Sequence, residues 1–284
     1  MDQKGGAFFS TLLVQLPFEL RKRTLACLPK ETLSVLCEIE EPIVKERFPT
    51  ILTSGGWLHK IHYSWFHEAL KGFSPRALSH FVALFPPERK KKLEILLGIS
   101  PKNFSNSPFS SYFLLAKLKK RIVPKTIISE EILSPHPLNE LLALSKEHLT
   151  SLINLIGVHD VIYEIKKIVD KTLLEKIYYA LLPKQLAFLK KYSNRQIRWS
   201  PPPLSLQQWN GEKKTLLNTI HDRGLIRFSY ALYEVDKNLI WHITHILDTG
   251  RAKKILSHIG KIPNKQLVSY FRKQVLEAKK EISS

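Results

Sequence analysis

Residues 138–177 read LNELLALSKEHLTSLINLIGVHDVIYEIKKIVDKTLLEKI, and this stretch decides the fold class. Its leucines, isoleucines and valines recur at steps of three and four residues. That is the period of one face of an α-helix, whereas a half-buried strand alternates every second residue. The same period runs through residues 16–36. We therefore predict an all-α protein. Gly157 and the Asp170–Lys171 step interrupt the apolar pattern, and we expect short helices to end at both points.

Proline marks where many of the helices begin. An apolar residue followed by proline recurs along the chain, and each pair precedes an amphipathic pattern. Proline suits the first turn of a helix because the amide it lacks has no intrahelical partner there. At Ser74–Pro75 the serine hydroxyl adds a cap. The pattern predicts short stacked helix pairs in an armadillo-like right-handed superhelix, with an ordinary helical globule as the alternative. The predicted helix starts are Pro17, Pro29, Pro75, Pro87, Pro183 and Pro263.

Segments rich in serine, asparagine and proline divide the chain. Residues 99–111 and 134–137 have this composition, and three consecutive prolines at 201–203 cannot continue a helix. We place boundaries at about 100–112 and 199–211. The predicted domains are an N-terminal helical domain at 1–100, a middle armadillo-like domain at 112–198 and a C-terminal helical domain at 211–284.

The chain is strongly basic. It has 284 residues, and 44 Lys and Arg stand against 25 Asp and Glu, which gives a formal net charge of +19. This charge is spread as +4 over residues 1–100, +8 over 101–209 and +7 over 210–284, so no part is a basic tail. We interpret the charge as a surface property that favours an acidic partner or an anionic membrane surface, with nucleic acid a less favoured partner.

The cysteine content and the hydropathy of the sequence predict the cellular compartment of the protein. Cys27 and Cys37 are the only cysteines, and both are interpreted as reduced core thiols. No signal peptide is recognised, and no window has the roughly 18 uncharged apolar residues that a transmembrane helix needs. We predict a cytoplasmic protein.

Motifs for catalysis are not found, and we predict a protein that is not an enzyme and has no catalytic residue, cofactor or metal. Two histidine pairs have a spacing that suits metal ligands. His59 and His62 are three residues apart, as are His242 and His245, and Asp248 follows three residues later. These residues would share a helix face. The helix around His242 also carries a strong apolar face, so we expect its histidines to flank core packing.

Two basic clusters could form a binding surface. The second cluster ends a predicted helix, where positive charge complements the helix dipole without any ligand. No helix-turn-helix or zinc-finger pattern accompanies either cluster, although a nucleic-acid-binding protein would need a continuous positive stripe. The basic residues are Arg89, Lys90, Lys91 and Lys92 in the first cluster, and Lys119, Lys120 and Arg121 in the second.

A family resemblance rests on an ordered set of short motifs. Residues 16–23 read LPFELRKR, residues 40–48 read EEPIVKERF, and Ser54-Gly55-Gly56 follows. This order resembles the FliG-type flagellar motor-switch proteins, and residues 135–195 are similar in style to the helical repeat of that family. The resemblance implies a cytosolic, all-helical protein with armadillo repeats on a type III export apparatus. The family's Glu-His-Pro-Gln surface motif is missing here, which favours an injectisome-type component or a paralogue over a working motor part.

The resemblance predicts a non-enzymatic adaptor of a bacterial type III secretion or flagellar basal body. It would link a membrane-ring protein to cytosolic ring or ATPase components through helix-groove contacts, at the inner face of the membrane. The alternatives are a nucleic-acid-binding helical-repeat protein and an F-box-like adaptor effector, because an LPxEL motif also opens the F-box. The candidate protein-binding residues are Leu16, Phe18, Leu20, Trp57, Trp65 and Phe66.

Overall fold

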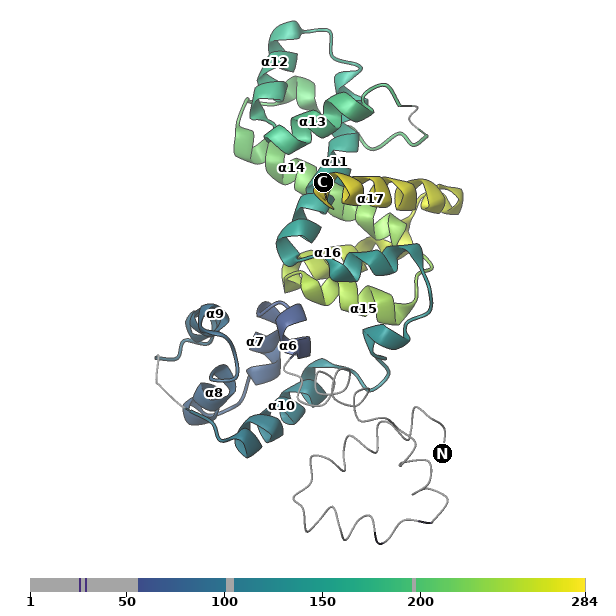
Figure 1. Ribbon diagram of the computed structural model, residues 1–284. Coiled ribbons are helices and arrows are strands. Elements are labelled where there is room, and N and C mark those ends of the chain that lie inside the picture. Colours follow the sequence, from purple (N-terminus) through teal and green to yellow (C-terminus); the bar gives the residue numbers. More distant parts are fainter. Residues whose placement is uncertain (1–25, 27–28, 30–55, 101–104, 196–197, 284) are drawn as a thin grey trace. The chain divides into compact units, whose positions relative to one another are not determined.

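The computed structural model describes Ala26, Pro29 and residues 56–100, 105–195 and 198–283 (Figure 1). Every regular element in those residues is helical, and no strand occurs among them. The predicted all-α class is therefore confirmed. None of the helices in the described part of the chain is long and apolar enough to cross a membrane.

The chain forms two compact units. The first comprises Met1–His59 and Asn106–Leu115, and the second comprises Lys60–Ser105 and Ala116–Ser284. In the first unit the described elements are most of α6 (Gly56–Lys60) and the first half of α10 (Pro108–Ile122). From α7 onward, the other helices of the described residues belong to the second unit.

The main core of the second unit is built around three helices. The helix α11 (Lys146–Ile165) packs along α14 (Lys213–Ala231), and α17 (Val268–Ser283) contacts both. Their apolar faces join one cluster of buried side chains that runs from Leu138 to Ile282. The other elements around this core are η1 (Glu130–Ile132), η2 (Pro137–Ala143), α12 (Lys171–Ala180), α13 (Pro183–Tyr192), η3 (Leu206–Gln208), α15 (Lys237–Ile246), α16 (Thr249–His258), η4 (Ile259–Lys261) and η5 (Lys265–Leu267).

Two glycines let α11 and α14 approach closely. A Cβ atom on Gly157 would lie 2.9 Å from the amide nitrogen of Gly224 and 2.9 Å from the carbonyl carbon of Ile220. A Cβ atom on Gly224 would lie 2.8 Å from the carbonyl carbon of Ile153, so the arrangement is reciprocal. The prediction that Gly157 ends a helix is wrong. It lies inside α11, where the neighbouring backbone leaves no room for a side chain.

Several helix starts follow the local signals of the sequence. The predicted start at Pro263 is wrong, because the next element, η5, begins at Lys265 with Asn264 as its cap, and Pro17 lies outside the described residues. Pro75, Pro87 and Pro183 each occupy the first position of their helices, α8 (Pro75–Val82), α9 (Pro87–Leu97) and α13. The Ser74 hydroxyl accepts a hydrogen bond from the amide of Ala77 at 3.4 Å, as predicted. At the predicted boundary after α11, the Asp170 carboxylate accepts from the amides of the first turn of α12. These contacts satisfy amides that have no partner within the helix.

Residues 199–211 contain no α-helix, as the prolines predict, but they pack against the core. The Trp199 ring meets the ring of Phe271 edge-on at 5.3 Å, and Pro201 and Leu206 are buried. Buried side chains from both sides of this segment belong to one cluster. The predicted middle and C-terminal domains therefore share a single hydrophobic core, because α14 and α17 bury their apolar faces against α11. The armadillo-like superhelix stays a prediction.

A smaller cluster of helices precedes the main core within the second unit. It contains α7 (Ser64–Leu70), α8 and α9, and the rings of Phe66 and Phe85 meet edge-on at 4.7 Å inside it. The amide of His62 donates to the carbonyl of His245 at 2.8 Å. The Trp65 indole stacks on the His245 ring at 3.9 Å and donates to the carbonyl of Leu247 at 2.9 Å. These contacts attach the α7–α9 cluster to α15 and the segment after it.

Candidate functional site

A buried ion pair lies at the centre of the three-helix core. Arg227 on α14 and Asp160 on α11 are each 1% exposed, and the guanidinium binds the carboxylate through two of its nitrogens. Gln274 on α17 accepts a third hydrogen bond from Arg227 at 2.8 Å. Arg227 thus ties together α11, α14 and α17, with its charge balanced inside the core.

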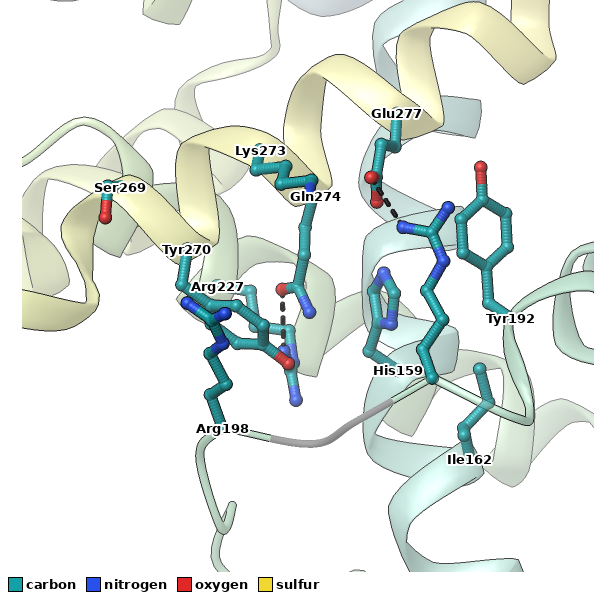
Figure 2. A pocket seen from close by; sticks show the side chains of 11 residues that line it. His159, Ile162, Tyr192, Arg198, Arg227, Ser269, Tyr270, Lys273, Gln274 and Glu277 are labelled. Atoms are coloured by element: carbon teal, nitrogen blue, oxygen red, sulfur yellow. Dashed lines mark hydrogen bonds and ion pairs between the residues drawn. The ribbon is translucent and has the colours of Figure 1, made fainter.

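A cavity of about 400 Å³ opens beside this ion pair (Figure 2). We call it the Arg227 pocket. Side chains from α11, α13, α14 and α17 line it, together with Arg195 and Arg198 from the segment that follows α13. His159 and Gln274 point into the space between α11 and α17 (Figure 2). The volume is at the small end of the range for ligand pockets.

The cations around the Arg227 pocket are only partly balanced. Four basic side chains and one carboxylate line it. Glu277 accepts a hydrogen bond from Arg195 at 2.5 Å, and this bond raises the pKa of Arg195. The Arg195 guanidinium also covers the Tyr192 ring at 4.3 Å. Among the described residues, no ion pair involves the other two cations, Arg198 and Lys273. Both are exposed.

His159 contributes a neutral ring to the same pocket. Burial first, and then the charges of Arg227 and Arg195, hold the pKa of His159 well below its ordinary value. Its Nε2 atom is buried and has no hydrogen-bond partner among the described residues. The ring packs edge-on against Phe188 at 5.2 Å and Tyr192 at 6.0 Å. A buried polar atom without a partner costs about 1–3 kcal/mol, so this position carries unused hydrogen-bonding capacity.

A second feature of the unit is an exposed apolar surface along α12. Tyr179 is 88% exposed and Leu182 is 42% exposed, whereas Ile177 and Ala180 on the other side of the helix are buried. Val169, just before the helix starts, is 93% exposed. We call the set Val169, Tyr178, Tyr179 and Leu182 the α12 surface.

Lysines are frequent in the sequence around the α12 surface. Five exposed lysines lie within residues 166–184, and the same range contains two acidic residues. One of the acids, Asp170, is engaged as the cap of α12. We call these five lysines, which are neighbours of the α12 surface in the sequence, the lysine rim. The five lysines are Lys166, Lys167, Lys171, Lys176 and Lys184.

The predicted protein-binding residues are placed only in part. Leu16, Phe18 and Leu20 lie outside the described residues, and Trp57 belongs to α6. Phe66 is buried in the α7–α9 cluster, and Trp65 is half-buried in its stack on His245. Packing inside the protein accounts for both of these aromatic side chains.

The predicted basic residues of the first cluster lie on α9. Arg89 is half-buried and donates to the carbonyl of Ile61 at 3.2 Å, and burial lowers its pKa. Lys90 lies 4.0 Å from Glu94 in an ion pair. Lys91 and Lys92 are exposed. The Lys92 ammonium lies 5.7 Å from the centre of the Tyr63 ring, so three of the four residues make contacts within the protein.

The second basic cluster lies in the last turn of α10, as predicted. Arg121 donates to the carbonyl of Ala69 at 2.9 Å and covers the Phe73 ring at 4.2 Å, so it joins α10 to the end of α7. Lys119 and Lys120 are exposed.

The histidines weighed as metal ligands take part in contacts between elements. The His62 Nε2 atom lies 2.7 Å from the Lys146 ammonium, and His245 is stacked between Trp65 and Trp241. His242 contacts the carbonyl of Ile128 at 2.8 Å. In the described part of the chain, no group of three or more potential ligands could hold a metal ion.

Comparisons of this chain with protein-family models, curated proteins and solved structures found no match.

Proposed function

We propose that this protein is a non-enzymatic helical adaptor that binds an acidic amphipathic helix of a partner protein on its α12 surface. The observation that supports this proposal is the exposed Tyr179, which exposed lysines flank in the sequence. Tyrosine is enriched at the centres of protein interfaces, where its ring is buried on binding, whereas lysine belongs at the rim.

The geometry of α12 suits a helical partner. The helix has ten residues, which corresponds to a length of about 15 Å. Val169 lies at its beginning, and Tyr178, Tyr179 and Leu182 lie at its end. A partner helix along this line could bury its apolar residues against both ends, in the manner of amphipathic helices recognised by apolar surfaces. Carboxylates flanking its apolar stripe would face the lysine rim and speed association.

The resemblance described above suggests the setting of this adaptor. The α12 surface lies within residues 135–195, the middle segment that is similar to the FliG-type helical repeat. We therefore propose that the partner belongs to a type III secretion or flagellar basal body, as the cytosolic tail of a membrane-ring protein or as a cytosolic ring component. The protein would then be cytoplasmic and peripheral at the inner membrane face, where its positive charge also suits anionic lipid headgroups.

Nucleic acid is the second candidate partner. Four lysines of the predicted basic clusters are exposed: Lys91, Lys92, Lys119 and Lys120. Binding through these lysines would weaken steeply with salt and would not depend on Tyr179.

The binding experiment uses the purified full-length protein and two fluorescent helical peptides. Both peptides carry leucines at i, i+3, i+4 and i+7, flanked by glutamates in one peptide and by lysines in the other. We expect the acidic peptide alone to bind, and Tyr179→Ser to weaken that binding at least tenfold, as for a tyrosine at an interface centre. Fluorescence anisotropy measures both affinities.

The matched control is Tyr112→Ser, because Tyr112 on α10 is also exposed, at 64%. It should leave the affinity for the acidic peptide within twofold. Equal binding of both peptides, or equal effects of the two substitutions, would contradict the proposal. Nucleic acid would be favoured as the partner if a DNA or RNA oligonucleotide bound in a salt-sensitive way and neither substitution changed that binding.

A further inference from the structure

The positive charges that line the Arg227 pocket outnumber the negative charges, and a bound anion would neutralise the excess. Asp160 neutralises Arg227, and Glu277 neutralises Arg195. Arg198 and Lys273 have no such partner among the residues that the structure describes, and both line the pocket. Lys273 is three residues after Tyr270 on α17, so the two residues are neighbours on that helix. Both Arg198 and Lys273 are exposed, so two positive charges of the lining remain unbalanced.

The interior of the pocket is suited to the body of a small molecule. Ile162 and the Tyr270 ring supply apolar wall, and the His159 ring supplies a polar group that is neutral at physiological pH. The Gln274 carbonyl is already engaged by Arg227, which fixes the wall on that side. Such a mixture of apolar surface and a few convergent polar groups is typical of ligand sites.

We propose that the Arg227 pocket binds a small phosphate monoester, with the phosphate between Arg198 and Lys273 and the body of the molecule over His159. A phosphate monoester carries about −1.5 to −2 charges at pH 7, which matches the two unbalanced cations. A single carboxylate would leave one of them unbalanced. Arginine also presents its donors in a planar fork that fits phosphate oxygens, and the lysine ammonium adds a point charge.

The size of the cavity limits the ligand. About 400 Å³ accommodates a molecule of mononucleotide size and excludes a folded polymer segment. This inference does not depend on the α12 surface, since the pocket is lined by α11, α14, α17 and the residues around the end of α13.

Isothermal titration calorimetry on the full-length protein tests the phosphate site. The probes are adenosine 5′-monophosphate, adenosine and succinate. We expect binding of the monophosphate alone, weakened by added salt. The double variant Arg198→Gln/Lys273→Gln should weaken it at least tenfold, since charge-assisted hydrogen bonds to phosphate are lost. Both side chains are exposed, so the variant should retain its fold.

The matched control is Lys190→Gln/Lys280→Gln, which removes the same charge from exposed positions of α13 and α17 outside the pocket. It should change the affinity less than twofold. The proposal is overturned if the monophosphate does not bind, if succinate binds equally well, or if the control variant weakens binding as much as the pocket variant.

His159→Phe tests where the body of the ligand lies. Phenylalanine keeps a ring edge-on against Phe188 and Tyr192 but removes the buried nitrogen that has no partner. We expect the melting temperature to rise, because an unsatisfied buried polar atom is lost, and the affinity for the monophosphate to fall at least threefold. Unchanged affinity in a folded variant would overturn the placement of the ligand over His159.

Discussion

Replacing Gly157 by alanine tests the packing at the centre of the second unit. Helix propensity alone predicts that Gly157→Ala, inside α11, stabilises the protein by about 1 kcal/mol. The structure predicts the opposite. The new Cβ atom would lie 2.9 Å from the amide nitrogen of Gly224 and from the carbonyl carbon of Ile220, and closer still to the oxygen of that carbonyl. All three atoms belong to the backbone of α14, so no side-chain rotation relieves the contact.

The loss of stability in Gly157→Ala follows from how far α11 and α14 must separate. Ordinary van der Waals contact begins at 3.4 Å, so α11 and α14 must separate by about 0.5 Å at the carbonyl carbon and by more at the oxygen, as the difference from 2.9 Å requires. Overpacking of a core costs about 1–3 kcal/mol when side chains can adjust, and more when they cannot. After subtraction of the propensity gain, we expect a net loss of at least about 2 kcal/mol.

Urea denaturation followed by far-ultraviolet circular dichroism measures this loss. The control is Gly260→Ala, because a Cβ atom at Gly260 meets nothing within 4 Å. It should be neutral or stabilise by up to about 1 kcal/mol. Gly224→Ala should resemble Gly157→Ala, and the double variant should cost less than the two single losses together, since one methyl group already separates the helices. A Gly157→Ala protein that is as stable as the control variant would refute the reasoning.

Two further predictions concern buried ionisable groups. Asp160→Asn leaves the Arg227 guanidinium buried without its carboxylate and should cost about 3–5 kcal/mol in urea denaturation. The control is Asp222→Asn, because Asp222 is exposed and pairs with Lys254. We expect this variant to change the free energy of unfolding by about 0.5 kcal/mol or less. Similar losses of stability in both variants would disprove a special role for the buried pair. The second prediction is acid instability. Burial lowers the pKa of His62 and of His245 from 6.5 to about 4, so between these values the unfolded chain binds more protons. Stability should therefore be full above about pH 6.5 and fall as the pH falls towards 4, by about 2 kcal/mol for each histidine at pH 5. Urea midpoints that are equal at about pH 8 and pH 5 would contradict this prediction.

Local signals in the sequence predicted the helical class and several helix ends. Proline at 75, 87 and 183 and the cap at Asp170 act within a single turn, so they can be read without knowledge of the tertiary structure. Gly157 shows the limit of such signals. The sequence does not distinguish a glycine that ends a helix from a glycine that allows a neighbouring helix to pack closely. Only the position of α14 shows that Gly157 has the second role.

The candidate sites depended more on tertiary structure. Arg89 and Arg121 were grouped with surface lysines, but their guanidinium groups bind carbonyls of α7 and of the residues just before it. The Arg227 pocket combines residues from positions 159 to 277, and no spacing in the sequence connects them. The α12 surface did carry a signal. Tyr178 and Tyr179 are adjacent on a helix whose buried face is already supplied by Ile177 and Ala180, so at least one ring must face solvent.

The central claim, that the α12 surface binds an acidic helix of a partner protein, is tested most directly by photo-crosslinking in the native cells. A photoreactive phenylalanine analogue replaces Tyr179 in one variant and Tyr112 in the control. We predict that position 179 alone forms a covalent adduct with a single protein, that mass spectrometry places the crosslink in an acidic amphipathic segment, and that the protein is a basal-body component. Adducts with nucleic acid only, or the same adducts from both positions, would contradict the claim.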